Sequence, residues 1–326
     1  MKKLPFISFL ILLIVCGVND QTYSWGFWAH KKINHQAVFT LPSGMIAFYK
    51  NHIDYLTKHS TDADKRRNIM PDEAPRHYIN PERFGVANID SIPEKWSDAV
   101  LIYGYDSLKE YGILPWYVME MMYQLTNAFK ERNVDRILKC SANMGHYIAD
   151  AHVPLHCTSN YNGQMTGQEG IHAFWESRIP ELFGDEYDYL VGKASYIPDP
   201  LKTIWQVVAD SYSAKDSVLE FEKRLNESFP SDKKFVIEKK GKKLIKVISK
   251  EYAEAYNTSL KGMIERRLRA SILLVGSLWY TAWVNAGQPD LLPIETLQAS
   301  DSLNVPITPF ERLVTPIKTN NKGHID

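Results

Sequence analysis

Cysteine is scarce in this chain, with three among 326 residues. A small secreted domain held together by disulfides uses cysteine far more densely, so that class is excluded. Only Cys140 and Cys157 lie outside the N-terminal leader described below, and they are seventeen residues apart on either side of a predicted helix. This separation argues against a disulfide between them. The fold must therefore rest on something other than cross-links.

An excess of charge of either sign is also missing. Lysine and arginine together number 38, as do aspartate and glutamate, so the formal net charge is zero. The chain has no overall basic character of the kind that follows a nucleic-acid backbone. A local exception is the run Lys65-Arg66-Arg67, where we expect Lys65 and Arg66 to be solvated loop residues.

Long apolar runs are confined to the N-terminus, where residues 4–18 follow two lysines and precede polar residues ending at Ser24. The run is short for a bilayer span, and this order of charge, apolar run and polar end is typical of secretory signals. We predict that residues 1–24 are a signal peptide and that the protein is exported, periplasmic or secreted, with no membrane span after cleavage. One alternative is that the apolar run is retained as a membrane anchor. Another is lipid attachment at Cys16, but Val15 stands where a small residue would be expected before the modified cysteine.

Apolar residues recur at spacings of three and four through most of the remaining chain, which predicts amphipathic helices. About 300 residues with 44% apolar content can bury a substantial core. We predict an all-α fold with a single multi-helix domain at 25–292, and a loosely ordered tail at 293–326, where periodicity is lost. The helices are expected at 29–40, 44–58, 93–111, 115–131, 133–151, 171–183, 200–228 and 249–286.

One segment departs from the helical pattern. Residues 235–237 and 244–248 are mostly apolar and β-branched, and they flank Lys239-Lys240-Gly241-Lys242. This pattern predicts a small β-hairpin projecting from the helices. Lysines keep an edge strand solvated, which is the interpretation we adopt, although the cationic hairpin could also touch an anionic surface.

The region from 146 to 176 concentrates residues that bind metals. It reads H-Y-I-A-D-A-H-V-P-L-H and, after fifteen residues, H-A-F-W-E. His146 and Asp150 are four residues apart, as are His172 and Glu176, so each pair lies on one helical face. His156 follows a proline and adds a donor from another direction. One pair would be an ordinary salt bridge, but two pairs with His156 between them favour a zinc site.

Other segments complete a recognisable pattern. His30 ends W-G-F-W-A-H, His77 lies in D-E-A-P-R-H-Y-I-N, and D-A-D-K-R-R precedes His77. Together with the central D-x-H-x-P-L-H run, they resemble the superfamily that joins bacterial zinc-dependent phospholipases C to the secreted zinc nucleases of fungi and plants that cut single strands. The resemblance runs from Trp25 to about Gly287.

The resemblance implies a trinuclear zinc cleft. Signal cleavage after Ser24 would expose the amino group of Trp25, which in the family binds zinc together with the Trp25 carbonyl. An α-amino group gives up its proton to a cation more easily than a lysine does. The implied ligands are Trp25 and His30 for one zinc, Asp64, His77 and His146 for a second, Asp150 bridging these two, and His156, His172 and Glu176 for the third.

The acidic ligand before His77 has two candidates, Asp62 and Asp64. The nuclease motif A-D-x-x-R matches residues 63–67 and favours Asp64. The same match makes Arg67 a candidate to bind phosphoryl oxygens, because a guanidinium group binds them in a forked geometry. We expect the other polar residues nearby to lie in loops, in solvent or behind the ligands: Asp72, Glu73, His52, His59 and His152.

The motifs that bear on the substrate resemble two different branches of the superfamily. A-D-x-x-R, His152 and Trp175 resemble the nucleases, whereas Glu176 and the short interval before His172 resemble the phospholipases. Asn80 and Ser177 replace an aspartate and an asparagine that hold the base in the nucleases, although the phospholipases also carry aspartate and asparagine there.

We predict a monomeric zinc-dependent phosphodiesterase of phospholipase C type. It would act on a phospholipid head group or another phosphodiester through a hydroxide held between two zincs, with Asp64, Arg67 and Asp150 as catalytic residues. The alternatives are a single-strand endonuclease or 3′-nucleotidase with nucleic acid as substrate, and an exported zinc-binding or phospholipid-binding protein without activity.

Overall fold

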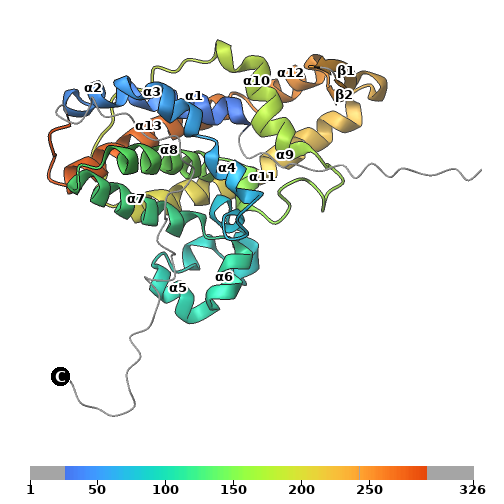
Figure 1. Ribbon diagram of the computed structural model, residues 1–326. Helices are drawn as coiled ribbons and strands as arrows, with labels where there is room; N and C mark the ends of the chain where they lie inside the picture. Colours follow the sequence, from blue (N-terminus) through green and yellow to red (C-terminus); the bar gives the residue numbers. More distant parts are fainter. Residues whose placement is uncertain (1–25, 242, 292–326) are drawn as a thin grey trace, which may run out of the picture.

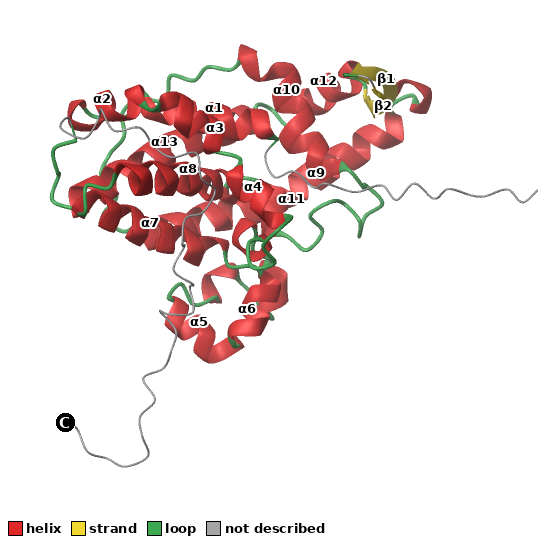
Figure 2. Ribbon diagram, viewed as in Figure 1, coloured by secondary structure: helices red, strands yellow, loops and turns green. Residues whose placement is uncertain are grey.

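The computed structural model describes residues 26–241 and 243–291, and this part of the chain is mostly helical with one two-stranded hairpin (Figures 1 and 2). The predicted signal, Trp25 and the predicted tail lie outside the described residues. The helices are α1 Phe27–Val38, α2 Ser43–Asn51, α3 Ile53–His59, α4 Asp62–Arg67, α5 Trp96–Tyr103, α6 Tyr105–Tyr111, α7 Leu114–Lys130, α8 Val134–Ala151, α9 Ile171–Ala173, α10 Ile179–Phe183, α11 Pro200–Ser228, α12 Lys250–Ser259 and α13 Met263–Asn285; the strands are β1 Phe235–Lys240 and β2 Lys243–Ile248.

The predictions of an all-helical core and of a β-hairpin are confirmed. Helices α7, α8 and α11 agree with the predicted segments to within a residue, because each has a clear local start. Asn133 caps α8 by accepting a hydrogen bond from the Arg136 amide at 3.1 Å. Asp199 caps α11 in the same way, with Pro200 as the first helical residue.

Three predicted helices are each divided in two. The segment 44–58 breaks at His52, 93–111 at Gly104 and 249–286 at Gly262. Gly104 and Gly262 have φ angles of 75° and 74°, which interrupt a right-handed helix and which glycine adopts without steric cost. The apolar period continues across these breaks because both halves pack on the same core, so the period alone did not reveal them.

The predicted helix 171–183 contains a π-helical turn, η5, at Phe174–Arg178 between α9 and α10. Pro180 has no amide hydrogen and cannot donate to the carbonyl group of Glu176, four residues earlier. That carbonyl instead accepts a hydrogen bond from the Gly26 amide at 3.1 Å. The first described residue is thereby held beside the residues around Glu176.

The core lies between α1, α3, α7, α8 and α13, which pack on one another. Asn34 of α1 donates to the carbonyl groups of Leu56 and Ala142 and so joins α1 to α3 and α8. Gly145 of α8 allows this close approach, since a Cβ atom there would lie 1.9 Å from Asn34 Oδ1.

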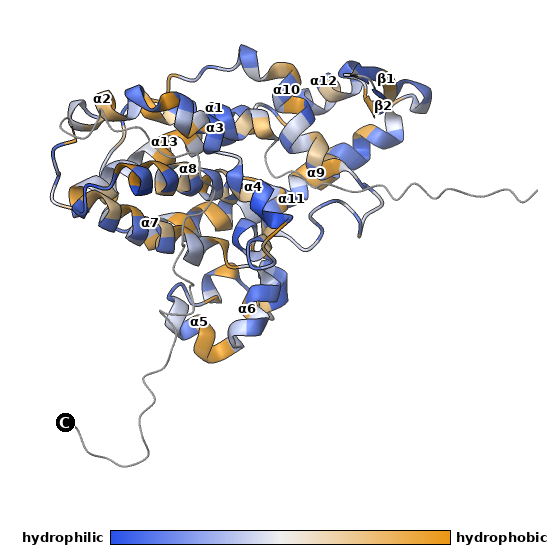
Figure 3. Ribbon diagram, viewed as in Figure 1, coloured by the Kyte–Doolittle hydropathy of each residue, from blue (hydrophilic) through white to orange (hydrophobic). Residues whose placement is uncertain are grey.

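In Figure 3, α4 and α6 are mostly hydrophilic, whereas part of α5 is apolar. Among the described helices, none has the length and apolar content needed to cross a membrane.

Candidate metal centre

Eight of the nine predicted metal ligands are described, and all eight side chains are buried. Their donor atoms converge in three groups, within each of which the atoms lie no more than 4.8 Å apart. Trp25 lies outside the described residues. The groups are His30, Asp64 and His146; His77, His146 and Asp150; and His156, His172 and Glu176.

Helices α1 and α8 supply the centre of the first two groups. His146 and Asp150 lie one turn apart on α8, as their spacing predicted, and both are fully buried. The His30 ring from α1 stacks on the His146 ring with centroids 3.9 Å apart. The close approach of α1 at Gly145 explains this stacking, because it brings the two backbones together next to His146.

Asp150 faces two directions at once. Its Oδ1 lies 3.4 Å from His30 Nε2, while its Oδ2 lies 2.9 Å from His77 Nδ1 and 3.3 Å from His146 Nε2. A carboxylate with one oxygen beside His30 and the other beside His77 and His146 has the geometry needed to bridge two cations.

Asp64 belongs to the first group, whereas Asp62 does not. Asp64 Oδ1 lies 3.7 Å from His146 Nε2 and 3.9 Å from His77 Nδ1. Both Asp64 carboxylate oxygens are buried without a hydrogen bond among the described residues. Asp62 instead binds His59 at 2.5 Å and Lys65 at 2.7 Å. His59 is buried by this pair, so the expectation that it is a solvent residue was wrong.

The third group lies where the 3₁₀ turn η4, Pro154–Cys157, meets α9 and η5. His172 Nε2 and His156 Nε2 lie 3.0 and 3.4 Å from Glu176 Oε2. Neither Glu176 oxygen has the geometry of a hydrogen bond with any described residue, although both are fully buried. Burial of a carboxylate without hydrogen bonds is costly, and a cation at this position would remove that cost.

Backbone carbonyl groups set the tautomers of three histidines. His146 Nδ1 lies 2.8 Å from Ser60 O, His156 Nδ1 2.5 Å from His77 O, and His172 Nδ1 3.1 Å from Tyr161 O. A carbonyl oxygen only accepts, so each Nδ1 must donate its hydrogen. In its neutral form each of these imidazoles would therefore direct the Nε2 lone pair into the donor groups, which is the usual arrangement of metal-binding histidines.

His77 has the opposite orientation. Its Nδ1 faces Asp150, and its Nε2 lies 3.6 Å from Glu73 Oε1. Glu73 is fully buried and accepts hydrogen bonds from Arg66, Arg76 and the Tyr147 hydroxyl. Glu73 does lie in a turn, as expected, but it is enclosed there, and the expectation that Arg66 is solvated was wrong. The carboxylate instead lies behind a candidate ligand, which the sequence indicated only through a Glu73–His77 spacing of four residues.

The pKa values indicate that these groups suit a cation. Burial and the charge on His146 lower the pKa of His30 to about 4, and burial lowers the pKa of His172 to about 4, so both rings are neutral at pH 7. Burial also lowers the pKa of His146, but Asp150 and Asp64 outweigh it and raise that pKa to about 9. Burial raises the pKa of Glu176 to about 8. At His146 and Glu176, a proton and a metal ion would therefore compete for the same donor atoms.

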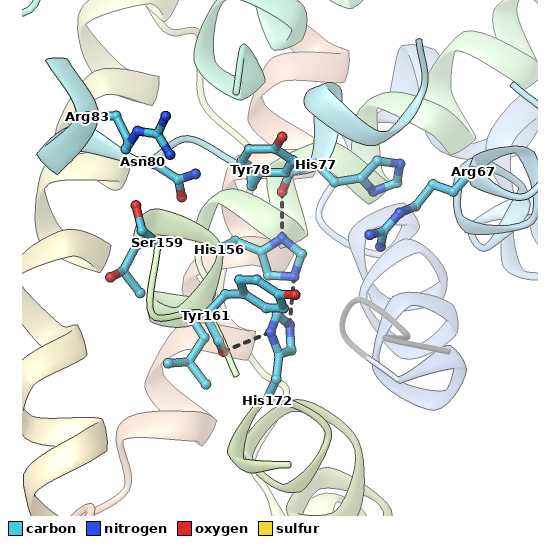
Figure 4. Close-up of a pocket in the computed structure, with 11 residues that line it drawn as sticks. Arg67, His77, Tyr78, Asn80, Arg83, His156, Ser159, Tyr161 and His172 are labelled. Atoms are coloured by element: carbon cyan, nitrogen blue, oxygen red, sulfur yellow. Dashed lines mark hydrogen bonds between the residues drawn. The ribbon is translucent and has the colours of Figure 1, made fainter. Parts of the chain in front are cut away.

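A cleft of about 360 Å³ opens beside these groups (Figure 4). His77, His156 and His172 form part of its wall, and Arg67 approaches them from the α4 side. The Arg67 side chain is 24% exposed, and its Nη1 lies 4.0 Å from Asp64 Oδ1. Asn80 and Ser159 lie toward the other end, whereas Ser177 packs against Gly26. The remaining lining residues are Tyr78, Arg83, Leu155, Thr158 and Tyr161.

The other polar residues that we singled out stand apart from the donor groups. His152 is buried behind α8, with Nδ1 2.8 Å from Ile148 O, and burial lowers its pKa to about 4. Asp72 is largely exposed and pairs with Lys109. Cys140 and Cys157 are both buried free thiols.

No known family model matches the chain, and no curated protein is significantly similar to it.

Proposed function

We propose that the chain is a zinc-dependent hydrolase of phosphate esters, of phospholipase C type, and a member of the phospholipase C and single-strand nuclease superfamily. The observation that carries this proposal is the convergence of eight buried nitrogen and oxygen donors in three groups beside one cleft. Structural ion pairs on a protein surface do not account for fully buried carboxylates without hydrogen-bond partners.

The donor set fits zinc. It consists of imidazole and carboxylate groups without thiolates, and three donors per group leave room for water or substrate. Zinc ions held by these groups would activate water and polarise the phosphoryl group. Three divalent ions against Asp64, Asp150 and Glu176 leave the site positive, which suits an anionic phosphodiester.

The chain's own residues would have separate tasks. Asp150 would hold two ions at a fixed separation, because its two oxygens face two donor groups. Arg67 would bind phosphoryl oxygens, because it lines the cleft next to Asp64. Glu73 would keep His77 in the tautomer that presents Nδ1 to the ions.

Removal of the leader is part of the proposal. The hydrogen bond from the Gly26 amide to Glu176 O holds the residue after Trp25 beside the third group. Gly26 also needs its small size there, since a Cβ atom would lie 2.5 Å from Ser177 Oγ. These contacts support the proposal that the mature protein begins at Trp25, is exported and offers its α-amino group to zinc.

A second candidate function is cleavage of single-stranded nucleic acid or of 3′-nucleotides. The observation that favours it is the presence of Tyr78 and Tyr161 in the cleft wall, with 45% of Tyr161 exposed. Aromatic faces of this kind stack on unpaired bases. Asn80 can donate or accept hydrogen bonds but lacks the charge of the aspartate found in the nucleases.

The deciding experiment incubates the purified exported protein in parallel with phosphatidylcholine vesicles, single-stranded DNA, RNA and a chromogenic phosphodiester. We expect zinc-dependent release of diacylglycerol, abolished by a chelator and restored by zinc. Cleavage of DNA or RNA alone would replace the lipase proposal with the nuclease. Full zinc occupancy without turnover of any of the four substrates would identify a binding protein.

A further inference from the structure

The β1–β2 hairpin exposes an apolar face that no described residue covers. Strand pairing places Ile237 opposite Lys246 and Lys239 opposite Leu244. Because side chains alternate across a strand, these four residues and Phe235 share one side, which we call the outer face. Phe235, Ile237 and Leu244 are 40, 65 and 73% exposed, and both lysines are exposed. Figures 1 and 2 show the hairpin at the edge of the molecule, beside α12.

The orientation of the hairpin is fixed from its other side. Arg178 donates to both carboxylate oxygens of Glu238, at 3.1 and 2.5 Å, and to the carbonyl group of Ile248 at 3.2 Å. Lys234 at the base of the hairpin binds Glu222 at 3.0 Å. These contacts hold the inner side against the helices, so the outer face is directed away from the protein.

The charge of this segment is strongly positive although the whole chain is neutral. Residues 233–250 contain eight lysines and one acidic residue, Glu238. Arg178 neutralises that acidic residue. On the outer face the Lys246 ammonium lies over the Phe235 ring at 4.2 Å, so cationic and apolar groups are in direct contact there.

We propose that the outer face of the hairpin docks onto an anionic lipid surface. Exposed aliphatic side chains beside lysines match the two layers of such a surface, because apolar groups enter the acyl boundary while ammonium groups meet the phosphates. A nucleic-acid surface fits less well, since Ile237 and Leu244 are not stacking platforms and the outer face carries no arginine.

This docking goes beyond the proposed hydrolase activity and does not require it. The hairpin is nevertheless joined to the candidate metal centre, because Arg178 lies in the same π-helical turn as Glu176. A lipid surface bound at the outer face would therefore meet a segment that is hydrogen-bonded to the turn carrying Glu176.

The test measures co-sedimentation of the purified exported protein with phosphatidylcholine vesicles, with and without phosphatidylglycerol. The Asp150→Asn protein is measured alongside, so that lipid turnover cannot change the vesicles. We expect binding that requires phosphatidylglycerol and weakens at high salt. Ile237→Thr/Leu244→Thr and Lys239→Gln/Lys246→Gln should each weaken it on the order of tenfold. Threonine keeps the strand propensity, and unchanged circular dichroism would verify folding.

Matched controls use residues away from the hairpin. Leu101→Thr/Leu190→Thr removes two apolar side chains that are 85 and 86% exposed, and Lys50→Gln/Lys130→Gln removes two exposed lysines. Both control proteins should bind like the unmodified chain. Equal binding to vesicles without phosphatidylglycerol, no binding at all, or equal losses in the control and hairpin variants would overturn the proposal. Binding of single-stranded RNA lost in the hairpin variants, with vesicle binding unchanged, would identify nucleic acid as the partner instead.

Discussion

Replacement of Glu73 by glutamine tests whether a buried carboxylate supports both the fold and the metal centre. Glu73 is fully buried and binds Arg66 at 3.1 and 3.2 Å and Arg76 at 2.7 Å. Glutamine keeps the volume but leaves two largely buried guanidinium groups without their counter-charge. Breaking a buried ion pair on one side costs about 3–5 kcal/mol, so we expect the free energy of unfolding to fall by about that amount.

The same substitution should weaken zinc binding. Glu73 faces His77 Nε2, and loss of a group that orients a metal-binding histidine reduces metal affinity by about 10–100-fold. Urea unfolding followed by circular dichroism, in zinc and in chelator, measures the stability. Competition with a chromogenic chelator measures the affinity. The two readouts separate a loss of packing from a loss of ligand orientation.

The pH dependence of this effect has a definite sign. Burial alone would raise the pKa of Glu73, but the nearby His77 ring and the charges of Arg66 and Arg76 outweigh it and lower the pKa. A lowered pKa stabilises the folded state above the pKa of the unfolded chain, which is ~4.3, and this contribution is lost at lower pH. The difference between Glu73→Gln and the unmodified protein should therefore narrow in acid.

Asp72→Asn provides the matched control, since Asp72 is adjacent in sequence but 56% exposed in its pair with Lys109. Exposed pairs contribute about 0–1 kcal/mol, so this variant should stay close to the unmodified protein. A loss below about 1 kcal/mol in Glu73→Gln, together with unchanged zinc affinity, would refute the role of Glu73.

Four further outcomes are expected. Asp150→Asn should lower the rate of phosphodiester hydrolysis on the order of a hundredfold or more, because one carboxylate faces two donor groups; near-normal turnover would contradict its bridging role. Metal analysis of protein isolated without chelator should find about three zincs per chain, and one or none would refute three sites. A methionine retained before Trp25 should impair hydrolysis, because it converts the α-amine into an amide; equal rates would exclude the terminal ligand. Glu120→Gln should raise the free energy of unfolding at pH 7, since burial raises the pKa of Glu120 and penalises its charged form. That gain should vanish below the ordinary glutamate pKa of ~4.3, and a pH-independent effect would exclude this cause.

Local patterns were enough to predict the helical architecture and much of the donor set. The spacing of His146 and Asp150, and of His172 and Glu176, determines that each pair shares a helical face whatever the helix packs against. Caps and prolines similarly set the ends of α8 and α11, because these signals act on the first or last turn alone. The hairpin followed from a lysine-glycine turn between two apolar runs.

Only the tertiary structure decided which polar residues face the centre. Asp62 and Asp64 are both carboxylates on one short helix, and their different partners come from α3 and α8, which are distant in sequence. From the sequence, Glu73 was predicted to be a loop carboxylate and Arg66 a solvated residue, because no local signal shows that a charged pair will be enclosed. The stacking of His30 on His146 depends on the approach of α1 to Gly145. Burial and charge pairing are properties of the packed chain, so these assignments could not follow from spacing along it.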